Sequence, residues 1–262
     1  MVERTIDVRA VQTQPTLGDV EENTCIAEEA IKKAMADRVD LLVFPELFLT
    51  GYHVGKLEAT VVEEAEEAVN KLTAAATETT VVIGTVTKNN EKQYNSAAII
   101  DQGEHIGTYH KTHLYGKEST VFDAGSSFPV FETSAGSLGI QICYDVEFPE
   151  VARQLTLAGA EILITPLANM RPFQSDQPIF GAVRALENIR PHIICNRVGE
   201  ERGIEFFGES AIFNERGQTL VSVGEDITTE LTATVELQAE GAETLRYIDD
   251  RRPEIYDSNH GE

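Results

Sequence analysis

The chain has 262 residues and a formal net charge of −23 at pH 7, because 44 acidic residues stand against 21 Lys and Arg. This acid excess disfavours nucleic acid and anionic membranes as partners. The N-terminus lacks a basic segment followed by an apolar core, and the longest apolar stretches are too short to span a membrane, so we expect a soluble, cytoplasmic protein.

The predicted elements alternate between strands and helices. In chain order they are a strand at 6–12, a helix at about 20–35, a strand at 40–44, a helix at 57–77, strands at 80–86 and 96–101, a strand at 137–143, a helix from 149, a strand at 161–166, a helix at 179–189, a strand at 192–196 and a hairpin over 208–223. The tail from about residue 246 is polar and irregular. No Gly-, Pro- or Ser-rich linker divides this rhythm, which indicates one α/β domain.

The cysteines Cys25, Cys143 and Cys195 lie far apart, form no CxxC pair and are odd in number, which argues against a disulfide framework. Cys25 lies on a helical pattern and Cys195 within a strand, so both are interpreted as core residues. Cys143 ends an apolar strand just before a predicted helix. A sharp turn there can present a nucleophile, although free cysteine more often packs as a small hydrophobe.

Three carboxylates, Asp145, Glu147 and Glu150, follow Cys143 closely. Negative surroundings disfavour a thiolate, so a reactive Cys143 needs a cation and a base from elsewhere in the chain. Either these acids point away from the thiol or other groups pair with them, for example with Asp145 capping the following helix.

Glu46 is flanked by apolar residues in LLVFPELFLTGY, where burial would turn a carboxylate into a proton acceptor or donor near neutrality. Lys111 lies in GTYHKTHLYGKE, with Glu118 a little further on. A lysine can hold an oxyanion as it develops. The alternatives are a solvated loop glutamate and an exposed surface lysine.

The order glutamate, lysine, cysteine resembles the carbon–nitrogen hydrolase (nitrilase) superfamily. The resemblance runs along most of the chain, through LLVFPELFLTGY, YHKTHLYGKESTVFDAG, GIQICYDVEFPEVAR, RALENIRPHIICNRVG and FFGESAIFNERG. It implies a Glu46–Lys111–Cys143 triad supported by Glu118. It further implies a four-layer α-β-β-α sandwich of the nitrilase type, with no metal and no organic cofactor.

The same resemblance implies a single domain over residues 1–262, with a core at about 5–240 and a C-terminal tail at 241–262. Subunits of similar proteins commonly associate through their outer helices, and C-terminal segments often exchange contacts. We therefore expect a homodimer or a higher homo-oligomer with the tail at a subunit interface.

The implied reaction is hydrolysis of a small carboxamide through a cysteine thioester. Glu46 would move the protons, while Lys111 and the backbone N–H of Tyr144 would hold the oxyanion. Nitrile-cleaving members typically carry Trp-Glu after the cysteine, whereas this chain has Tyr144 and Asp145, which favours the amidase-like branch. Hydrolysis of N-carbamoyl compounds, or of nitriles on the same triad, stays open, whereas acyl transfer is disfavoured because its members are usually membrane-bound.

Tyr52, Tyr144, Asn169 and Arg171 lie in segments that shape the pocket of similar proteins, and Arg171 is either a clamp for a carboxylate or an exposed loop residue.

Two other hypotheses compete with the enzyme: a catalytically silent binding protein on this fold, and a globular protein with a buried cysteine. The second does not explain the ordered set of matching segments.

The acidic composition suggests adaptation to a salt-rich cytoplasm, where screening weakens self-repulsion between the carboxylates. We expect the melting temperature to be higher in concentrated KCl than in dilute buffer, as measured by circular dichroism. Equal melting temperatures would reject salt adaptation and leave an ordinary acidic protein.

Overall fold

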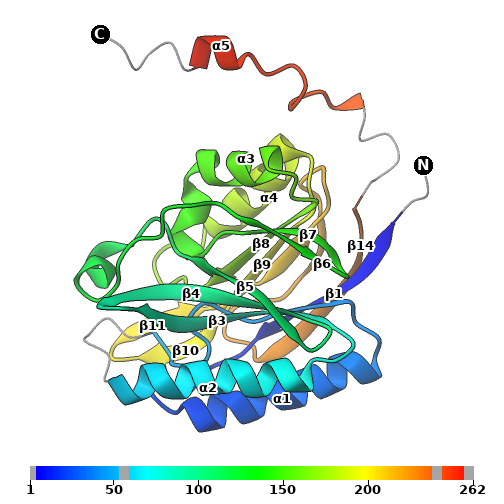
Figure 1. Cartoon of the computed structure of the whole chain (residues 1–262). Coiled ribbons are helices and arrows are strands. Elements are labelled where there is room, and N and C mark those ends of the chain that lie inside the picture. Colours follow the sequence, from blue (N-terminus) through cyan, green and yellow to red (C-terminus); the bar gives the residue numbers. More distant parts are fainter. Residues whose placement is uncertain (1–3, 53–58, 238–243, 257–262) are drawn as a thin grey trace.

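Two six-stranded sheets pack face to face, and a pair of helices covers the outer face of each (Figure 1). This arrangement comes from a computed structural model that describes residues 4–52, 59–237 and 244–256. The layers run helix, sheet, sheet, helix, so the four-layer sandwich expected from the sequence is confirmed.

The first sheet has the strand order β14-β1-β2-β3-β4-β5. Its strands are β1 (Thr5–Gln12), β2 (Leu41–Val43), β3 (Thr80–Asn89), β4 (Lys92–Asp101), β5 (Glu104–His110) and β14 (Thr229–Glu236). Helices α1 (Val20–Ala36) and α2 (Ala59–Ala75) cover it. Asp19 caps α1 by accepting a hydrogen bond from the N–H of Glu22, which fixes where this helix begins.

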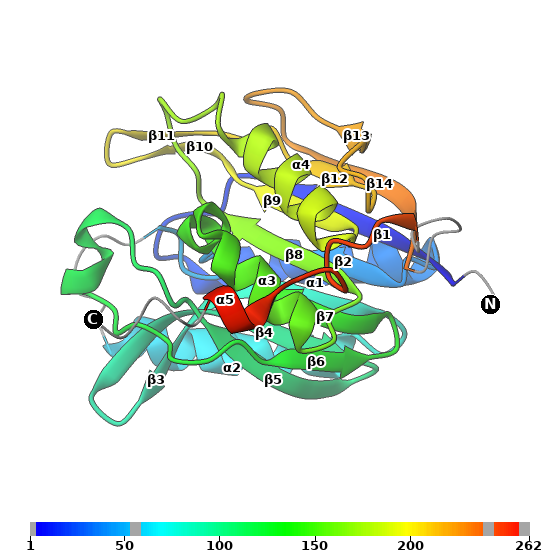
Figure 2. The same cartoon turned by 90° about the horizontal axis from the view of Figure 1, so that it is seen from above.

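The second sheet has the order β13-β12-β9-β8-β7-β6. Its strands are β6 (Val130–Thr133), β7 (Gly136–Ile140), β8 (Ile162–Leu167), β9 (His192–Asn196), β12 (Ala211–Phe213) and β13 (Thr219–Ser222). Helices α3 (Pro149–Leu157) and α4 (Gln177–Asn188) lie over it, as Figure 2 shows from above. A separate ribbon pairs β10 (Val198–Glu201) with β11 (Ile204–Phe207).

The largest cluster of buried side chains fills the space between the two sheets. Val8 and Ile99 from the first sheet belong to it together with Ile140, Ile164 and Ile193 from the second. A further cluster lies between the first sheet and helices α1 and α2. The central strands are therefore buried on both faces, which explains why their sequences are nearly continuous apolar runs.

Several strands end at one edge of the sandwich, and the chain leaves them there in short loops. Parallel pairing joins β1, β2 and β3 in one sheet and β7, β8 and β9 in the other, so the carboxyl ends within each set lie together. Glu46 follows β2, Cys143 follows β7 and Ala168 follows β8. The N–H of Glu46 donates to the carbonyl of Leu167 at 3.2 Å, which ties the two sheets at this edge.

A glycine on β3 makes room for the loop that carries Glu46. A Cβ atom at Gly84 would lie 2.2 Å from the carbonyl oxygen of Pro45 and 2.4 Å from the amide nitrogen of Leu47. These are backbone atoms and cannot move aside as a flexible side chain could. Gly84 thus permits the close crossing that places Glu46 in the interior.

The predicted strands and helices match the structure closely, with a few differences. The strand at 192–196 has the predicted bounds, whereas β7 ends at Ile140 rather than at Cys143, because the chain turns away before the cysteine. Strands β5, β6, β10, β11 and β14 were not predicted, and the irregular tail contains a short helix, α5 (Pro253–Tyr256). The helix predicted at 57–77 begins partly outside the described residues.

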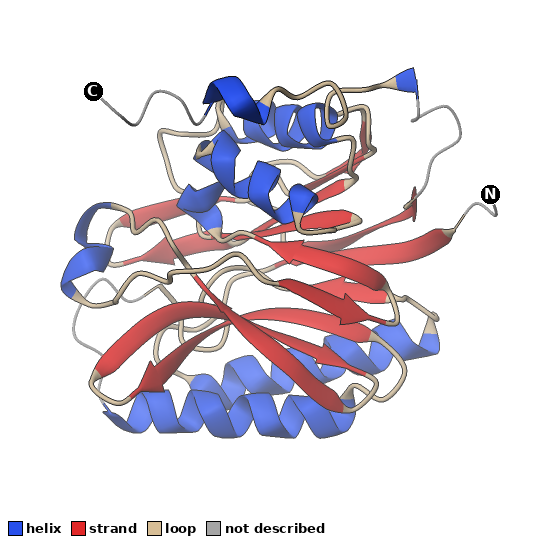
Figure 3. Cartoon of the chain, turned by 45° about the horizontal axis from the view of Figure 1, so that its top comes forward, coloured by secondary structure: helices blue, strands red, loops and turns tan. Residues whose placement is uncertain are grey.

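Helix α5 and the segment before it lie over α3 on the outer surface (Figure 3), where Tyr247 and Tyr256 share a shallow depression with Arg153.

Among the described residues, the helices are too short or too polar to cross a membrane.

His192 on β9 is an uncharged histidine in the core. Its ring hydrogen-bonds to the Thr165 hydroxyl at 2.7 Å and to the carbonyl of Gly181 at 2.9 Å. Burial lowers the pKa of His192 from 6.5 to about 4, because the interior disfavours the imidazolium. In the unfolded chain this histidine takes up a proton below about pH 6.5.

We therefore expect His192 to make the fold less stable as the pH falls from about 6.5 to 4. At 1.36 kcal/mol per pKa unit, this loss is roughly 3 kcal/mol. Urea unfolding of the wild type and of His192→Gln across this range measures it, because the variant lacks this contribution. His105→Gln, at an exposed position, is the control. Parallel pH profiles for wild type and His192→Gln would contradict the prediction.

Candidate active site

Cys143 lies in a strained turn directly after β7. Its φ is +46°, a left-handed conformation that few non-glycine residues adopt, and it begins a short 3-10 helix, η2 (Cys143–Glu147). Such strain persists only where the surroundings enforce it, and it is commonest at functional sites. The turn leaves the cysteine partly exposed in the wall of a cavity.

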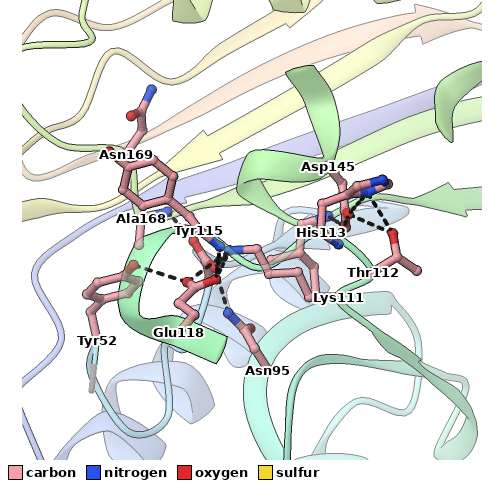
Figure 4. Close-up of polar contacts among 12 residues, drawn as sticks. Tyr52, Asn95, Lys111, Thr112, His113, Tyr115, Glu118, Asp145, Ala168 and Asn169 are labelled. Carbon is pink, nitrogen blue, oxygen red and sulfur yellow. Dashed lines mark hydrogen bonds and ion pairs between the residues drawn. The ribbon is translucent and has the colours of Figure 1, made fainter. Parts of the chain in front are cut away.

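The centre of the site is a buried ion cluster around Lys111, which follows β5 (Figure 4). The Lys111 ammonium donates to the Glu46 carboxylate at 2.7 Å and to that of Glu118 at 2.9 Å. The side chains of Lys111 and Glu46 are fully buried, and that of Glu118 is 1% exposed. Residues separated by up to 72 positions thus share one ammonium group.

Glu46 has two further donors that were not predicted. The Asn95 side chain donates to Oε1 at 2.7 Å, and the Ala168 N–H donates to Oε2 at 2.8 Å. Asn95 lies on β4 and Ala168 directly follows β8, so the two sheets together fix this carboxylate. Asn95 stands in the polar half of its strand, where the sequence does not mark it as buried, and a backbone donor leaves no mark in the sequence.

Glu118 belongs to the 3-10 helix η1 (Gly116–Thr120) and is held from two sides. The Tyr52 hydroxyl donates to its carboxylate at 3.0 Å, and the Tyr115 N–H donates at 2.8 Å. Tyr52 is positioned in turn by Glu201, whose carboxylate accepts from the Tyr52 N–H at 2.8 Å. Arg197, buried against the Phe206 ring, pairs with Glu201.

The charges of this cluster act on the thiol of Cys143. Burial raises its pKa well above the ordinary value, and Glu46 and Glu118 raise it further, while Lys111 opposes them. Burial alone would lower the pKa of Lys111, but the two carboxylates outweigh it and raise that pKa well above the usual range. The site therefore holds a neutral thiol beside a permanent cation, and the thiol needs a base in order to react.

Asp145, which follows the cysteine by two residues, is buried and pairs away from the thiol. Its carboxylate accepts hydrogen bonds from the Tyr109 hydroxyl at 2.8 Å, the Thr112 hydroxyl at 2.7 Å and the N–H groups of Ile142 and His113. Burial alone would raise the pKa of Asp145, but these donors lower it. Asp145 thus ties the nucleophile turn to the loop after Lys111 rather than capping α3.

A cavity of about 240 Å³ opens in front of Cys143. Its lining is largely apolar and aromatic, from Tyr115, Tyr144, Leu167, Phe173 and Phe180. Glu147 and Asp176 are the carboxylates in its wall, and both are exposed to solvent. A cavity of this volume can hold a small molecule whose reacting carbon lies next to the Cys143 thiol.

The expected contact residues fall into two groups. Tyr52, Tyr144 and Asn169 line the cavity. Asn169 is held by Asn196, whose side chain accepts from its N–H at 2.9 Å. Arg171 lies elsewhere: its guanidinium pairs with Glu205, Glu225 and Asp226 at 2.7 to 3.2 Å. The structure thus places Arg171 away from the described cavity lining, with its charge already matched.

Metal ligands are absent from the described part of the chain, in that no three or more His, Cys, Asp or Glu side chains are grouped to hold an ion. The carboxylates around Lys111 are neutralised by its ammonium and by hydrogen-bond donors instead. Their arrangement suits proton transfer and stabilisation of an oxyanion.

Comparison with known proteins agrees with this geometry. Residues 7–247 match the carbon–nitrogen hydrolase family. The chain is 34% identical to a probable nitrilase of Schizosaccharomyces pombe, over 95% of this chain and 97% of the relative. It is 31% identical to an (R)-stereoselective amidase of a Pseudomonas species, over 94% and 91% of the two chains.

Among solved structures, the fold is similar to a variant of the amidase from Nesterenkonia sp. AN1, with a TM-score of 0.85 and 28% identity over 97% of this chain and 96% of that one. In that structure the acetamide moiety of fluoroacetamide is added covalently at the active-site cysteine. The resemblance inferred from the ordered sequence segments is therefore confirmed, and the chain belongs to the carbon–nitrogen hydrolase family of enzymes.

Proposed function

We propose that this chain hydrolyses a small carboxamide to the acid and ammonia, with Cys143 as the nucleophile. The observation that carries the proposal is the buried Lys111 ammonium between Glu46 and Glu118, whose charges all act on the thiol. The relative named as an amidase and the amidase with a modified cysteine support the same reaction class.

The reaction starts from the neutral thiol. Glu46 accepts the proton as Sγ attacks the amide carbon, so that the thiolate forms only as the carbon–sulfur bond forms. The N–H of Tyr144, next to the nucleophile, and the Lys111 ammonium stabilise the negative oxygen of the tetrahedral intermediate. Glu46 then gives this proton to the amide nitrogen as the carbon–nitrogen bond breaks, so that ammonia leaves and a thioester to Cys143 remains.

A second cycle releases the acid. Glu46 takes a proton from water, which attacks the thioester, and the returning proton restores the thiol. Glu118 contacts Lys111, and Tyr52 contacts Glu118. Neither reaches the reacting carbon in this mechanism, so both act as positioning residues. They hold the Lys111 ammonium in a fixed position while Glu46 takes up and releases a proton.

Two related reactions use the same groups. A carbamoyl compound presents the same carbonyl and leaving amine. A nitrile would add the thiol to give a thioimidate, which takes up water and loses ammonia to give a thioester. The Tyr144–Asp145 pair after the cysteine favours the amide, and Asp145 is committed to five hydrogen bonds in the fold. Ammonia release from a panel of amides, carbamoyl compounds and nitriles distinguishes the three.

Homodimer formation and a cytoplasmic location stay predictions.

Replacing Cys143 by Ala removes the only group positioned to form the thioester, so we expect ammonia release from amides to fall at least about 10³-fold. The melting temperature should change little, because Cys143 is only partly buried. Cys25, predicted from the sequence to be a core residue, is exposed on α1, so Cys25→Ala is the matched control and should keep full activity. Amide hydrolysis that survives in Cys143→Ala would exclude this mechanism.

Glu46→Gln tests the base, and it also separates an enzyme from a silent binding protein. The raised pKa of Cys143 leaves little thiolate at neutral pH, and loss of the Glu46 charge would itself lower that pKa, so slower alkylation by iodoacetamide in the variant reports loss of the base. We expect labelling of Cys143 to slow at least about tenfold in the variant at neutral pH. Labelling of Cys25, read in the same peptide map, serves as the internal reference. Equal labelling rates at Cys143 in wild type and variant would remove Glu46 from the mechanism.

A further inference from the structure

The outer wall of the cavity in front of Cys143 carries negative charge. Glu147 ends η2, and Asp176 stands directly before α4. Both line the cavity, and Lys, Arg and His are missing from its described lining. A substrate that reaches Cys143 therefore meets carboxylates as the only charged side chains of the described wall.

These carboxylates are not neutralised within the described part of the chain. The Glu147 carboxylate makes no ion pair or hydrogen bond there, since the Arg184 guanidinium donates to the Glu147 backbone carbonyl instead. The Asp176 carboxylate accepts one hydrogen bond, from the neighbouring Ser175 hydroxyl. Burial and the negative charge of Asp176 raise the pKa of Glu147. A cation in the cavity would relieve this mutual repulsion.

Aromatic rings also line the wall. The Tyr115 ring packs edge-on against the rings of Tyr144 and Phe173, with centroids 5.3 and 6.3 Å apart. Phe180 completes the lining on the α4 side. The faces of aromatic rings attract ammonium groups, particularly beside a carboxylate. The wall thus combines the two kinds of group that recognise organic cations.

Among the residues that the structure describes, an anionic substrate finds no comparable partner. Arg171, the cation that the sequence offered as a clamp, is occupied by Glu205, Glu225 and Asp226. The Lys111 ammonium is buried between Glu46 and Glu118, where it serves the reacting carbonyl. The net charge of −23 would also repel an anion on its approach.

We propose that the preferred substrate is an amide whose far end carries a cationic group, and that Glu147, with Asp176, binds that group at the mouth of the cavity. This inference rests on the proposed amide hydrolysis. It assigns Glu147 and Asp176 as specificity-determining residues and the aromatic wall as the support for the chain between the two ends.

The test uses three amides of one length: 5-aminopentanamide, hexanamide and the monoamide of adipic acid. They differ only in a terminal group that is cationic, neutral or anionic. We expect kcat/KM for the cationic amide to exceed that for hexanamide roughly five- to tenfold at low salt, with the anionic amide lowest. A shorter set, 3-aminopropanamide, butanamide and the monoamide of succinic acid, covers the other spacing.

Glu147→Gln should bring the ratio of kcat/KM between the cationic and neutral amides close to one, and Asp176→Asn should reduce it. Glu150→Gln is the matched control, because it removes the same charge three residues away at an exposed position of α3 outside the cavity lining. Concentrated KCl should lower the wild-type ratio by screening.

The outcomes separate the two proposals. If the enzyme cleaves no amide in either set, the proposed function fails. If it cleaves hexanamide or butanamide at least as well as the cationic amide, or if Glu147→Gln leaves the ratio unchanged, amide hydrolysis stands and this inference is overturned.

Discussion

The structure depends on one buried ion cluster, in which a single ammonium neutralises two carboxylates. Removing these charges from water costs several kcal/mol per ion, and the cost is met only when every charge has partners. Here Lys111 bridges Glu46 and Glu118, while Asn95, the Ala168 N–H, the Tyr52 hydroxyl and the Tyr115 N–H supply the remaining donors. Both sheets and two loops contribute, so the cluster forms only when the whole sandwich has formed.

The same cluster accounts for the nucleophile role that we propose for a cysteine in a strongly acidic protein. Carboxylates that could repel a thiolate are used elsewhere: Asp145 ties the turn to a neighbouring loop, and Glu118 holds the lysine. In the proposed mechanism Glu46 accepts the thiol proton. A neutral thiol, this base and the Lys111 cation would then keep the cysteine unreactive until an amide carbonyl is in place.

The proposed catalytic residues and the proposed specificity-determining residues lie in different parts of the fold. The ion cluster lies in the rigid interior where strands end, whereas the outer cavity wall comes from η2 and the segment before α4. Loops of this kind can vary without disturbing the strands beneath them. A change of charge at Glu147 or Asp176 would thus alter which amides bind and leave the ion cluster in place.

By itself the sequence indicated the α/β class, the approximate positions of most helices and strands, and Glu46, Lys111, Cys143 and Glu118 as candidate site residues, because apolar periodicity is local and the ordered segments are specific. It did not reveal β14, which pairs with β1 more than 200 residues away, or Asn95 and the Ala168 N–H beside Glu46. Only the tertiary structure decided that the Asp145 carboxylate accepts hydrogen bonds in the interior, that Glu147 lines the cavity and that Arg171 forms ion pairs with three acidic residues. The physical reason is that partners and burial depend on which distant segments meet, and no local pattern records that.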